Sequence, residues 1–374
     1  MKKFSEQDKK YMQLAINLAE KARGKTAPNP MVGAVIIKDG HIISTGYHRK
    51  AGKPHAEIEA IKKCREPLTG SKMYITLEPC STYGRTPPCT TELKKHNFSE
   101  IIIGSKDPNP KAFDRGIKIL RDHGFKVKVG LLAPRIRKQN EAFFKNMEKA
   151  IPFVTAKIAS SIDGKLAAKS GDSKWITSTE SRKTVQKLRA EAGCTLTGIN
   201  TVISDNPYLF PRKKLDDYSV EKRLENFTRV ILDSSLRIAL DSNIVKTSNK
   251  VNTIIFSSSN NIKKEDKLKS NNIKVVKINL KASGSLLKIL KILYQEFSIY
   301  SILVESGPTL LTSLLEANLI DRLTIFLAPI IIGANSGYDM FGDLGINHIK
   351  EAKKLVFDKV AEQGKDIMAI AYPK

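Results

Sequence analysis

The sequence predicts an α/β protein with two domains. Its 374 residues are more than a single hydrophobic core usually organises, so the length favours two. Short apolar runs that suit strands alternate with helical patterns through both halves, which is typical of α/β architecture. The stretch Ala150-Ile151-Pro152 interrupts this alternation, so we expect domains at residues 1–147 and 148–374.

The first half opens with a helix and a hairpin. Residues 8–23 carry apolar positions at helical spacing, and Pro28-Asn29-Pro30 ends that helix. Strands are expected at 31–37 and 41–46, joined by a turn at Asp39-Gly40. The further elements expected, in order, are a helix at 55–64, a strand at 72–77, a helix start near 88–89, a strand at 101–104, a helix at 118–122, a strand at 126–130 and a helical stretch at 131–149.

The second half is richer in strands. An amphipathic helix is expected at 285–297, between two of them. Two charged segments, 216–226 and 258–270, suit loops or surface helices. The expected strands are 153–160, 195–200, 229–233, 251–257, 273–278, 302–305, 323–327, 355–359 and 366–372, the last ones forming an antiparallel tail.

Composition limits the classes of protein. No apolar run approaches the ~20 residues of a membrane span, and the first residues lack the apolar segment of a signal peptide. Four cysteines without a disulfide pattern suit a reducing compartment, so we expect a cytoplasmic protein. The net charge of +25 comes mostly from scattered lysines, without an Arg-rich arm. We therefore expect no nucleic-acid or membrane partner, whereas a phosphorylated small substrate would gain from the positive field.

The clearest chemical pattern joins His55 and Glu57 to Cys80 and Cys89. One imidazole and two thiolates are good zinc ligands, and three protein ligands leave the fourth position open for a water. Glu57 follows the histidine by two residues and can reach such a water without being a ligand. His-x-Glu followed by Pro-Cys and a second cysteine is the pattern of zinc deaminases.

A structural zinc site is the alternative reading of these residues. Eight residues separate the two cysteines, which departs from the tight spacing of the simple deaminase signature. His48 or Cys64 could supply a fourth ligand, although neither lies at usual spacing.

The second half has one stretch with chemical character, Val304 to Leu311. A strand ends there in a Gly-containing turn, and a helix follows whose first N–H groups suit a phosphate. Such turns are common, so the motif alone is weak.

Several motifs of both halves, taken together, resemble the bifunctional pyrimidine deaminase–reductase family of riboflavin biosynthesis. The first half contributes Thr26-Ala27-Pro28-Asn29-Pro30, Pro54-His55-Ala56-Glu57, Leu77-Glu78-Pro79-Cys80, Gly84-Arg85-Thr86-Pro87-Pro88-Cys89 and Asp107-Pro108-Asn109-Pro110. The second half contributes Lys157-x-Ala159, Ser173-Lys174-Trp175, Arg189, Gly198-x-Asn200-Thr201 and Glu305-x-Gly307-Pro308. The wide cysteine spacing also matches this family.

For the first half, the resemblance implies a cytidine-deaminase-like α/β/α sandwich that binds Zn²⁺. His55, Cys80 and Cys89 would be its ligands and Glu57 its proton shuttle, with Asn29, His48 and Arg85 around the substrate. Two positions depart from the family: Thr82 stands where a histidine is usual, and Asp114 where a glycine is usual. A glycine position can require a positive φ, so Asp114 raises a question about the path of its loop.

For the second half, the resemblance implies a dihydrofolate-reductase-like α/β domain that uses NADPH. The implied cofactor contacts are Ala159, Trp175, Thr201, Asp205, Ser234, Gly307, Pro308, Thr309, Leu310, Leu311, Thr312 and Ser313. The implied substrate contacts are Ser173, Arg189, Leu209, Arg212 and Glu305. Arg189 and Arg212 suit a ribose phosphate, because guanidinium can bind phosphate through two bonds at once.

The function expected is therefore two consecutive reactions on one phosphorylated pyrimidine: zinc-dependent deamination, then NADPH-dependent reduction of the ribosyl group to ribityl. The residues do not select an acid or base for the reduction between Lys157 and Asp163. The resemblance also suggests a homo-oligomer, either dimer or tetramer. The alternatives are a tRNA or nucleic-acid zinc deaminase with an accessory domain, and a zinc-stabilised protein without catalysis.

Overall fold

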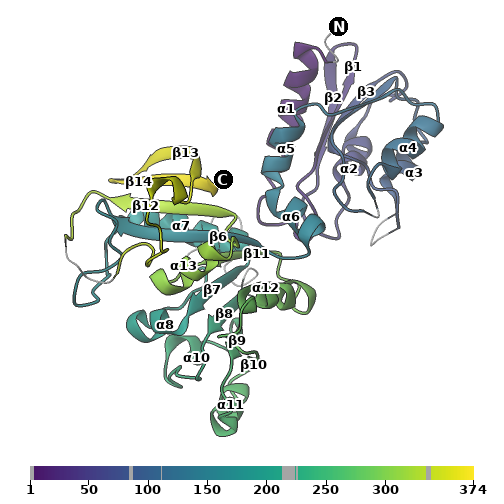
Figure 1. Cartoon of the computed structure of the whole chain (residues 1–374). Coiled ribbons are helices and arrows are strands. Elements are labelled where there is room, and N and C mark those ends of the chain that lie inside the picture. Colours follow the sequence, from purple (N-terminus) through teal and green to yellow (C-terminus); the bar gives the residue numbers. More distant parts are fainter. Residues whose placement is uncertain (1–3, 84–86, 111, 213–223, 225, 334–337) are drawn as a thin grey trace. The chain divides into compact units, whose positions relative to one another are not determined.

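The chain forms two compact units, Met1–Ala150 and Ile151–Lys374 (Figure 1). The structure is a computed structural model, and it describes residues 4–83, 87–110, 112–212, 224, 226–333 and 338–374. The division falls just after helix α6 (Glu141–Lys149), and the boundary expected between residues 147 and 148 lies inside that helix.

The first unit is built on a five-stranded sheet in the order β2-β1-β3-β4-β5. Strand β1 is antiparallel to both of its neighbours, whereas β3, β4 and β5 run parallel. The strands are β1 (Gly33–Lys38), β2 (His41–Tyr47), β3 (Lys72–Leu77), β4 (Glu100–Ser105) and β5 (Val127–Val129).

Helices cover both faces of this sheet (Figure 1). Helix α1 (Glu6–Glu20) and α5 (Ala133–Gln139) bury Met12 and Ile136 in one apolar cluster with Val35 of the sheet. On the other face, α2 (Ala56–Lys63), α3 (Cys89–Leu93) and α4 (Arg115–Asp122) pack against the sheet in a second cluster. The predicted α/β/α sandwich is confirmed.

Two helices of this unit have other bounds than expected, since α1 ends at Glu20 rather than at residue 23 and α4 begins at Arg115 rather than at residue 118, and one expected helix is divided. The helical stretch expected at 131–149 is divided into α5 and α6 at Asn140. The Asn140 side chain accepts a hydrogen bond from the Met31 N–H at 2.7 Å and donates one to the Met31 carbonyl at 3.0 Å. This pairing fixes Asn140 at φ −107° and ψ 24°, which interrupts the helix. The pattern of apolar residues did not contain this long-range contact.

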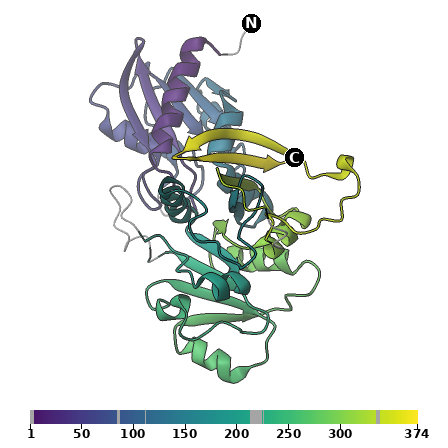
Figure 2. The same cartoon turned by 90° about the vertical axis from the view of Figure 1, so that its left-hand side faces the viewer.

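The second unit has a nine-stranded sheet in the order β10-β9-β8-β7-β11-β6-β12-β14-β13. The first seven strands in this order are mutually parallel, and the last two pair antiparallel. The strands are β6 (Phe153–Ser161), β7 (Cys194–Gly198), β8 (Thr228–Leu232), β9 (Asn252–Ser257), β10 (Ile273–Lys277), β11 (Ser301–Val304), β12 (Arg322–Ala328), β13 (Leu355–Gln363) and β14 (Asp366–Pro373). The predicted α/β domain with an antiparallel tail is confirmed, and Figure 2 shows that tail as a long hairpin.

Two helices of this unit begin directly after strands and so mark the carboxyl edge of the sheet, where open α/β folds bind ligands. Helix α8 (Ile199–Asp205) follows β7, and α13 (Pro308–Glu316) follows β11. The structure also describes the helices α7 (Thr179–Ala192), α10 (Asn243–Lys246), α11 (Ile262–Lys269), α12 (Ser285–Gln295) and the short η1 (Ile349–Glu351). Of the two charged segments, 258–270 contains α11, while most of 216–226 lies outside the described residues.

No helix in the described part of the chain is both long and apolar enough to cross a membrane.

Candidate active sites

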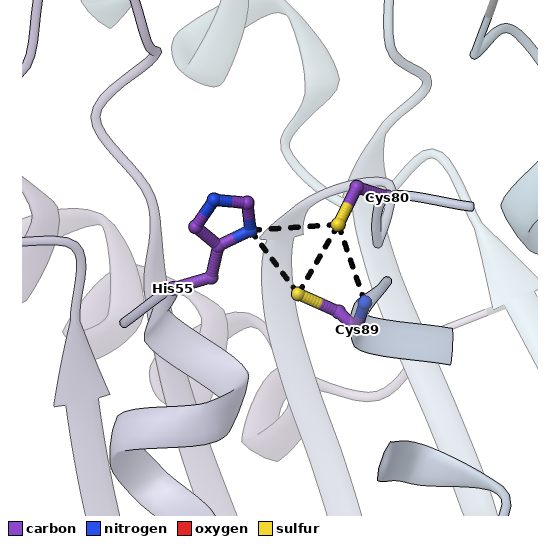
Figure 3. Close-up of side chains that lie close together, drawn as sticks. All are labelled: His55, Cys80 and Cys89. Atoms are coloured by element: carbon purple, nitrogen blue, oxygen red, sulfur yellow. Dashed lines mark hydrogen bonds between the residues drawn. The ribbon is translucent and has the colours of Figure 1, made fainter. Parts of the chain in front are cut away.

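Three side chains converge in the first unit at the starts of two helices. His55 is the residue before α2, Cys89 opens α3, and Cys80 lies in the loop after β3. The His55 Nδ1 atom lies 3.1 Å from the Cys89 sulfur and 3.5 Å from the Cys80 sulfur, and the two sulfurs are 3.4 Å apart (Figure 3). One small ion could contact all three donors.

The chemistry of the donors fits zinc. Among the described residues, only His55, Cys80 and Cys89 gather as a group of potential metal ligands. Hydrogen bonds from Cys89 and His55 lower the pKa of Cys80 to about 4, so this sulfur is available as a thiolate ligand. A nitrogen and two sulfurs are zinc donors, and three of them leave a coordination position open.

The two residues considered as a fourth ligand are engaged elsewhere. The His48 ring nitrogens contact the Asn29 amide and the Pro54 carbonyl, each at 3.1 Å. Cys64 follows the far end of α2, and its thiol donates to the Glu66 carbonyl at 3.4 Å. The open position therefore favours a catalytic over a structural metal.

Glu57 lies in the first turn of α2, next to this triad. Its side chain is buried, with 3% exposure, and burial raises the pKa of its carboxyl above the ordinary range. Its Oε2 atom has no hydrogen-bond partner among the described residues. A buried, unsatisfied carboxylate oxygen beside three zinc donors is suited to hold a water there.

The substrate residues expected in this unit are partly brought together. The His48 ring lies 5.2 Å from that of His55, edge on, and the contact with His48 places Asn29 in the same site. Burial lowers the pKa of His48, which favours a neutral imidazole. Arg85 lies outside the described residues, and Thr82 is exposed.

Glu78 ties the Cys80 loop to the loop after β4. Its buried carboxylate accepts hydrogen bonds from the backbone N–H groups of Asp107, Asp114, Gly116 and Ile117. This contact fixes the Asp107-Pro108-Asn109-Pro110 motif beside the cysteine loop, and burial raises the pKa of Asp107 to about 6. This role of Glu78 was not predicted, although its position immediately before Pro79-Cys80 could have pointed to a part in the metal site.

Asp114 adopts the conformation that a glycine would favour. Its φ of 61° lies in the left-handed region, and it precedes the first residue of α4. Asp is among the side chains that tolerate this region, and its Oδ2 pairs with Lys106 Nζ at 2.9 Å. The departure from glycine therefore keeps the loop's backbone conformation.

The second unit contains a cavity of about 1300 Å³ at the carboxyl edge of its sheet. Most of the residues expected there line it: Ala159, Ser173, Trp175, Arg189, Thr201, Asp205, Leu209, Arg212, Glu305, Gly307, Pro308, Thr309, Leu310 and Ser313. Three do not. Leu311 is buried in the apolar core, Thr312 accepts a hydrogen bond from the Gly342 N–H at 2.7 Å, and Ser234 lies beyond the lining.

A buried ion-pair network forms one wall of this cavity. Arg189 contacts both Glu305 carboxylate oxygens, with Nε at 2.5 Å from Oε1 and Nη2 at 3.0 Å from Oε2. Lys157 adds a second cation, 3.4 Å from Oε2. Burial alone would raise the pKa of Glu305, but the two cations lower it to about 2. Arg189 is therefore committed to Glu305, whereas Arg212 is exposed, with its guanidinium over the Tyr208 ring.

The two candidates for acid–base chemistry are separated by the structure. Lys157 lines the cavity. The Asp163 carboxylate is outside the lining and accepts hydrogen bonds from the Ile332 and Gly333 N–H groups.

Comparison with known proteins finds relatives that match nearly the whole length of the chain. A family model described as "RibD C-terminal domain" matches residues 152–369. A relative from Aquifex aeolicus (strain VF5), named riboflavin biosynthesis protein RibD, is 42% identical over 96% of this chain and 97% of its own. The chain belongs to the RibD family. Its members are bifunctional deaminases and reductases of riboflavin biosynthesis, and Zn²⁺ and NADPH are the cofactors of the two activities.

The other matches agree with this membership. The model described as "Cytidine and deoxycytidylate deaminase zinc-binding region" covers residues 5–105, which contain the triad and Glu57. The RibD structure of Acinetobacter baumannii (form 1) is 35% identical with a TM-score of 0.86, over 98% of this chain and 99% of that one. A Thermotoga maritima structure, a diaminohydroxyphosphoribosylaminopyrimidine deaminase/5-amino-6-(5-phosphoribosylamino)uracil reductase, is 33% identical with a TM-score of 0.83 over the same shares. A nucleic-acid deaminase with an accessory domain is not favoured, because the second half is itself the family's reductase domain.

Proposed function

We propose that the first unit deaminates a diaminopyrimidine ribosyl phosphate and that the second unit reduces the ribosyl group of the product. The observation that carries the proposal is the zinc-fitting triad with the buried Glu57 beside it. The name of the Thermotoga maritima relative supports the choice of substrate.

In the first unit, His55, Cys80 and Cys89 would hold the zinc. Zinc supplies Lewis-acid activation of a water at its open position. Glu57 would take a proton from a water as the water oxygen bonds to the amine-bearing carbon of the pyrimidine. It would then deliver that proton to the ring amine, so that the carbon–nitrogen bond breaks and the amine leaves as ammonia. A carboxyl whose pKa is raised by burial is better matched to both transfers than an ordinary one. Asn29 and the neutral His48 hold the polar edge of the pyrimidine.

In the second unit, NADPH supplies the hydride. At the start of α13, Pro308 has no N–H and the Gly307 N–H donates to Thr201 Oγ1 at 3.3 Å, so the backbone N–H groups of Thr309 and Leu310 are the ones offered to a cofactor phosphate. Arg212 binds the ribose phosphate, since its guanidinium is exposed at the cavity. Lys157 and the Arg189–Glu305 pair, which line the same cavity, hold the ribosyl group.

Removal of the metal should separate the two activities. Dialysis against a chelator is expected to abolish deamination and to leave reduction of the already deaminated substrate unchanged, because the triad lies in the first unit only. Both rates are measured on the same sample, and added Zn²⁺ should restore the first. Deamination that persists in zinc-free protein would refute the proposed role of the triad.

We also propose a homo-oligomer located in the cytoplasm. Strand β13 is an edge of its sheet, and its apolar side chains Val356, Phe357 and Val360 are 51%, 64% and 60% exposed, which is a surface that a second copy could cover. All four cysteines are free thiols, as suits a reducing compartment. Sedimentation velocity tests the assembly, and a single species of 41.6 kDa would contradict it.

A further inference from the structure

Trp175 is held in an unusual state at the reductase cavity. Its φ of 67° lies in the left-handed region, and its side chain is 73% exposed while lining the cavity. Non-glycine residues rarely adopt this region, and such strained positions persist only where their surroundings enforce them. A large indole that is both strained and exposed therefore needs a specific support.

Arg182, in the first turn of α7, provides this support. Its guanidinium carbon lies 4.3 Å from the centroid of the indole ring, within the range of a cation–π contact. The guanidinium is itself fixed at two points, because Nη1 donates to the Thr177 carbonyl and Nη2 donates to Thr179 Oγ1 at 2.9 Å. The indole is thus supported by a flat cation that cannot easily turn away.

Arg182 also faces the cavity with other residues of its helix. Arg182, Gln186 and Arg189 recur at helical spacing along α7, and all three line the cavity. The face of α7 that carries the Arg189–Glu305 pair therefore also carries the support of Trp175, two turns earlier in the helix.

We propose that Arg182 is a positioning residue of the reductase, which holds the Trp175 indole as a fixed wall of the NADPH site. This inference rests on the proposed cofactor contact of Trp175. Without Arg182 the indole moves freely and must be ordered when NADPH binds, so cofactor affinity falls. The reaction of bound substrates is little affected, because Arg189, Glu305 and Lys157 keep their contacts.

A purely structural Arg182 would behave differently. Both of its hydrogen bonds go to residues at the start of α7, so it could simply stabilise that helix. In that case its loss would lower the melting temperature and leave both Trp175 and the dissociation constant of NADPH unchanged.

The experiment uses the fact that Trp175 is the only tryptophan, so fluorescence excited at wavelengths that tyrosine does not absorb reports this residue directly. Fluorescence anisotropy, acrylamide quenching and titration with NADPH are compared for wild type, Arg182→Met, Arg182→Lys and the control Lys183→Met, an exposed cation at the next position. For Arg182→Met we expect lower anisotropy, stronger quenching and an NADPH dissociation constant raised about fivefold to tenfold, with kcat of reduction within about twofold. Arg182→Lys should be intermediate, because an ammonium lacks the flat face, and it decides the question if the Met variant does not fold.

The outcomes distinguish a failure of the role inferred for Arg182 from a failure of the proposed cofactor contact of Trp175. Wild-type protein that reduces its substrate while NADPH leaves the fluorescence unchanged would remove Trp175 from the cofactor site, and the inference with it. A wild-type NADPH signal combined with unchanged anisotropy and affinity in the Arg182 variants would overturn the inference and leave the proposed role of Trp175 standing.

Discussion

Glu57→Gln is expected to lower kcat of deamination by about 10²- to 10⁴-fold, the range found for a positioned acid–base group. Glutamine keeps the size of the buried side chain but cannot take a proton from water or deliver one to the departing amine. The three ligand atoms are untouched, so the variant should still bind one zinc per chain. Ammonia release and metal content are measured on the same preparation, and the reduction rate of deaminated substrate serves as internal reference.

Glu59→Gln is the matched control for this change. It removes a carboxylate from the same helix, but the Glu59 carboxylate is paired with Arg49 and Lys63 rather than with any of the three ligands. Its deamination rate should be close to wild type. A Glu57→Gln variant that keeps both its zinc and the wild-type rate would contradict the assigned proton transfer and would support a zinc site that only stabilises the fold.

Arg189→Met is expected to abolish reduction and to destabilise the second unit. The change leaves the Glu305 carboxylate, 7% exposed, with Lys157 as its remaining cation. Breaking a buried ion pair from one side costs about 3–5 kcal/mol, because the other charge stays buried without its partner. Urea unfolding measures the stability loss, and oxidation of NADPH with deaminated substrate measures reduction.

Two further variants show whether the effects of Arg189→Met come from loss of the bonds to Glu305 or from loss of a positive charge on α7. Arg189→Lys keeps the charge but cannot reproduce two parallel bonds to Glu305, so it should recover much of the stability and only part of the reduction rate. Lys187→Met, an exposed cation of the same helix, should change neither. Reduction at the wild-type rate in Arg189→Met would show that the pair has no part in the reductase site.

The strands were predictable because their apolar runs are local. Strands β6, β8, β9 and β12 begin and end within two residues of their expected limits, since each run is bounded by polar or turn-forming residues. Helix α7 was missed: its 14 residues are mostly polar and bury few side chains, so the apolar period is weak. The break at Asn140 depends on Met31, which is 109 positions away in sequence, and no local pattern contains it.

The gathering of His55, Cys80 and Cys89 was predictable to the residue, because zinc chemistry restricts which side chains can serve as ligands. The reductase contacts were less so. A run of seven residues from Gly307 to Ser313 was expected to contact the cofactor, but successive positions of a helix point in different directions, and Leu311 turns into the core. The cavity-facing Arg182 and Gln186 were missed, although their spacing with Arg189 on one helix was a usable signal. The contact of Arg182 with Trp175 depends on the left-handed backbone of Trp175, which no residue pattern in the sequence predicts.

The most direct test of the two-step function is mass spectrometry of the products formed from the diaminopyrimidine ribosyl phosphate, with and without NADPH. Without NADPH, the zinc-loaded chain should yield the deaminated compound alone; with NADPH, it should yield the deaminated and reduced compound. If the zinc-loaded chain forms no deaminated compound and releases no ammonia from this substrate, the proposed zinc-dependent deamination is wrong.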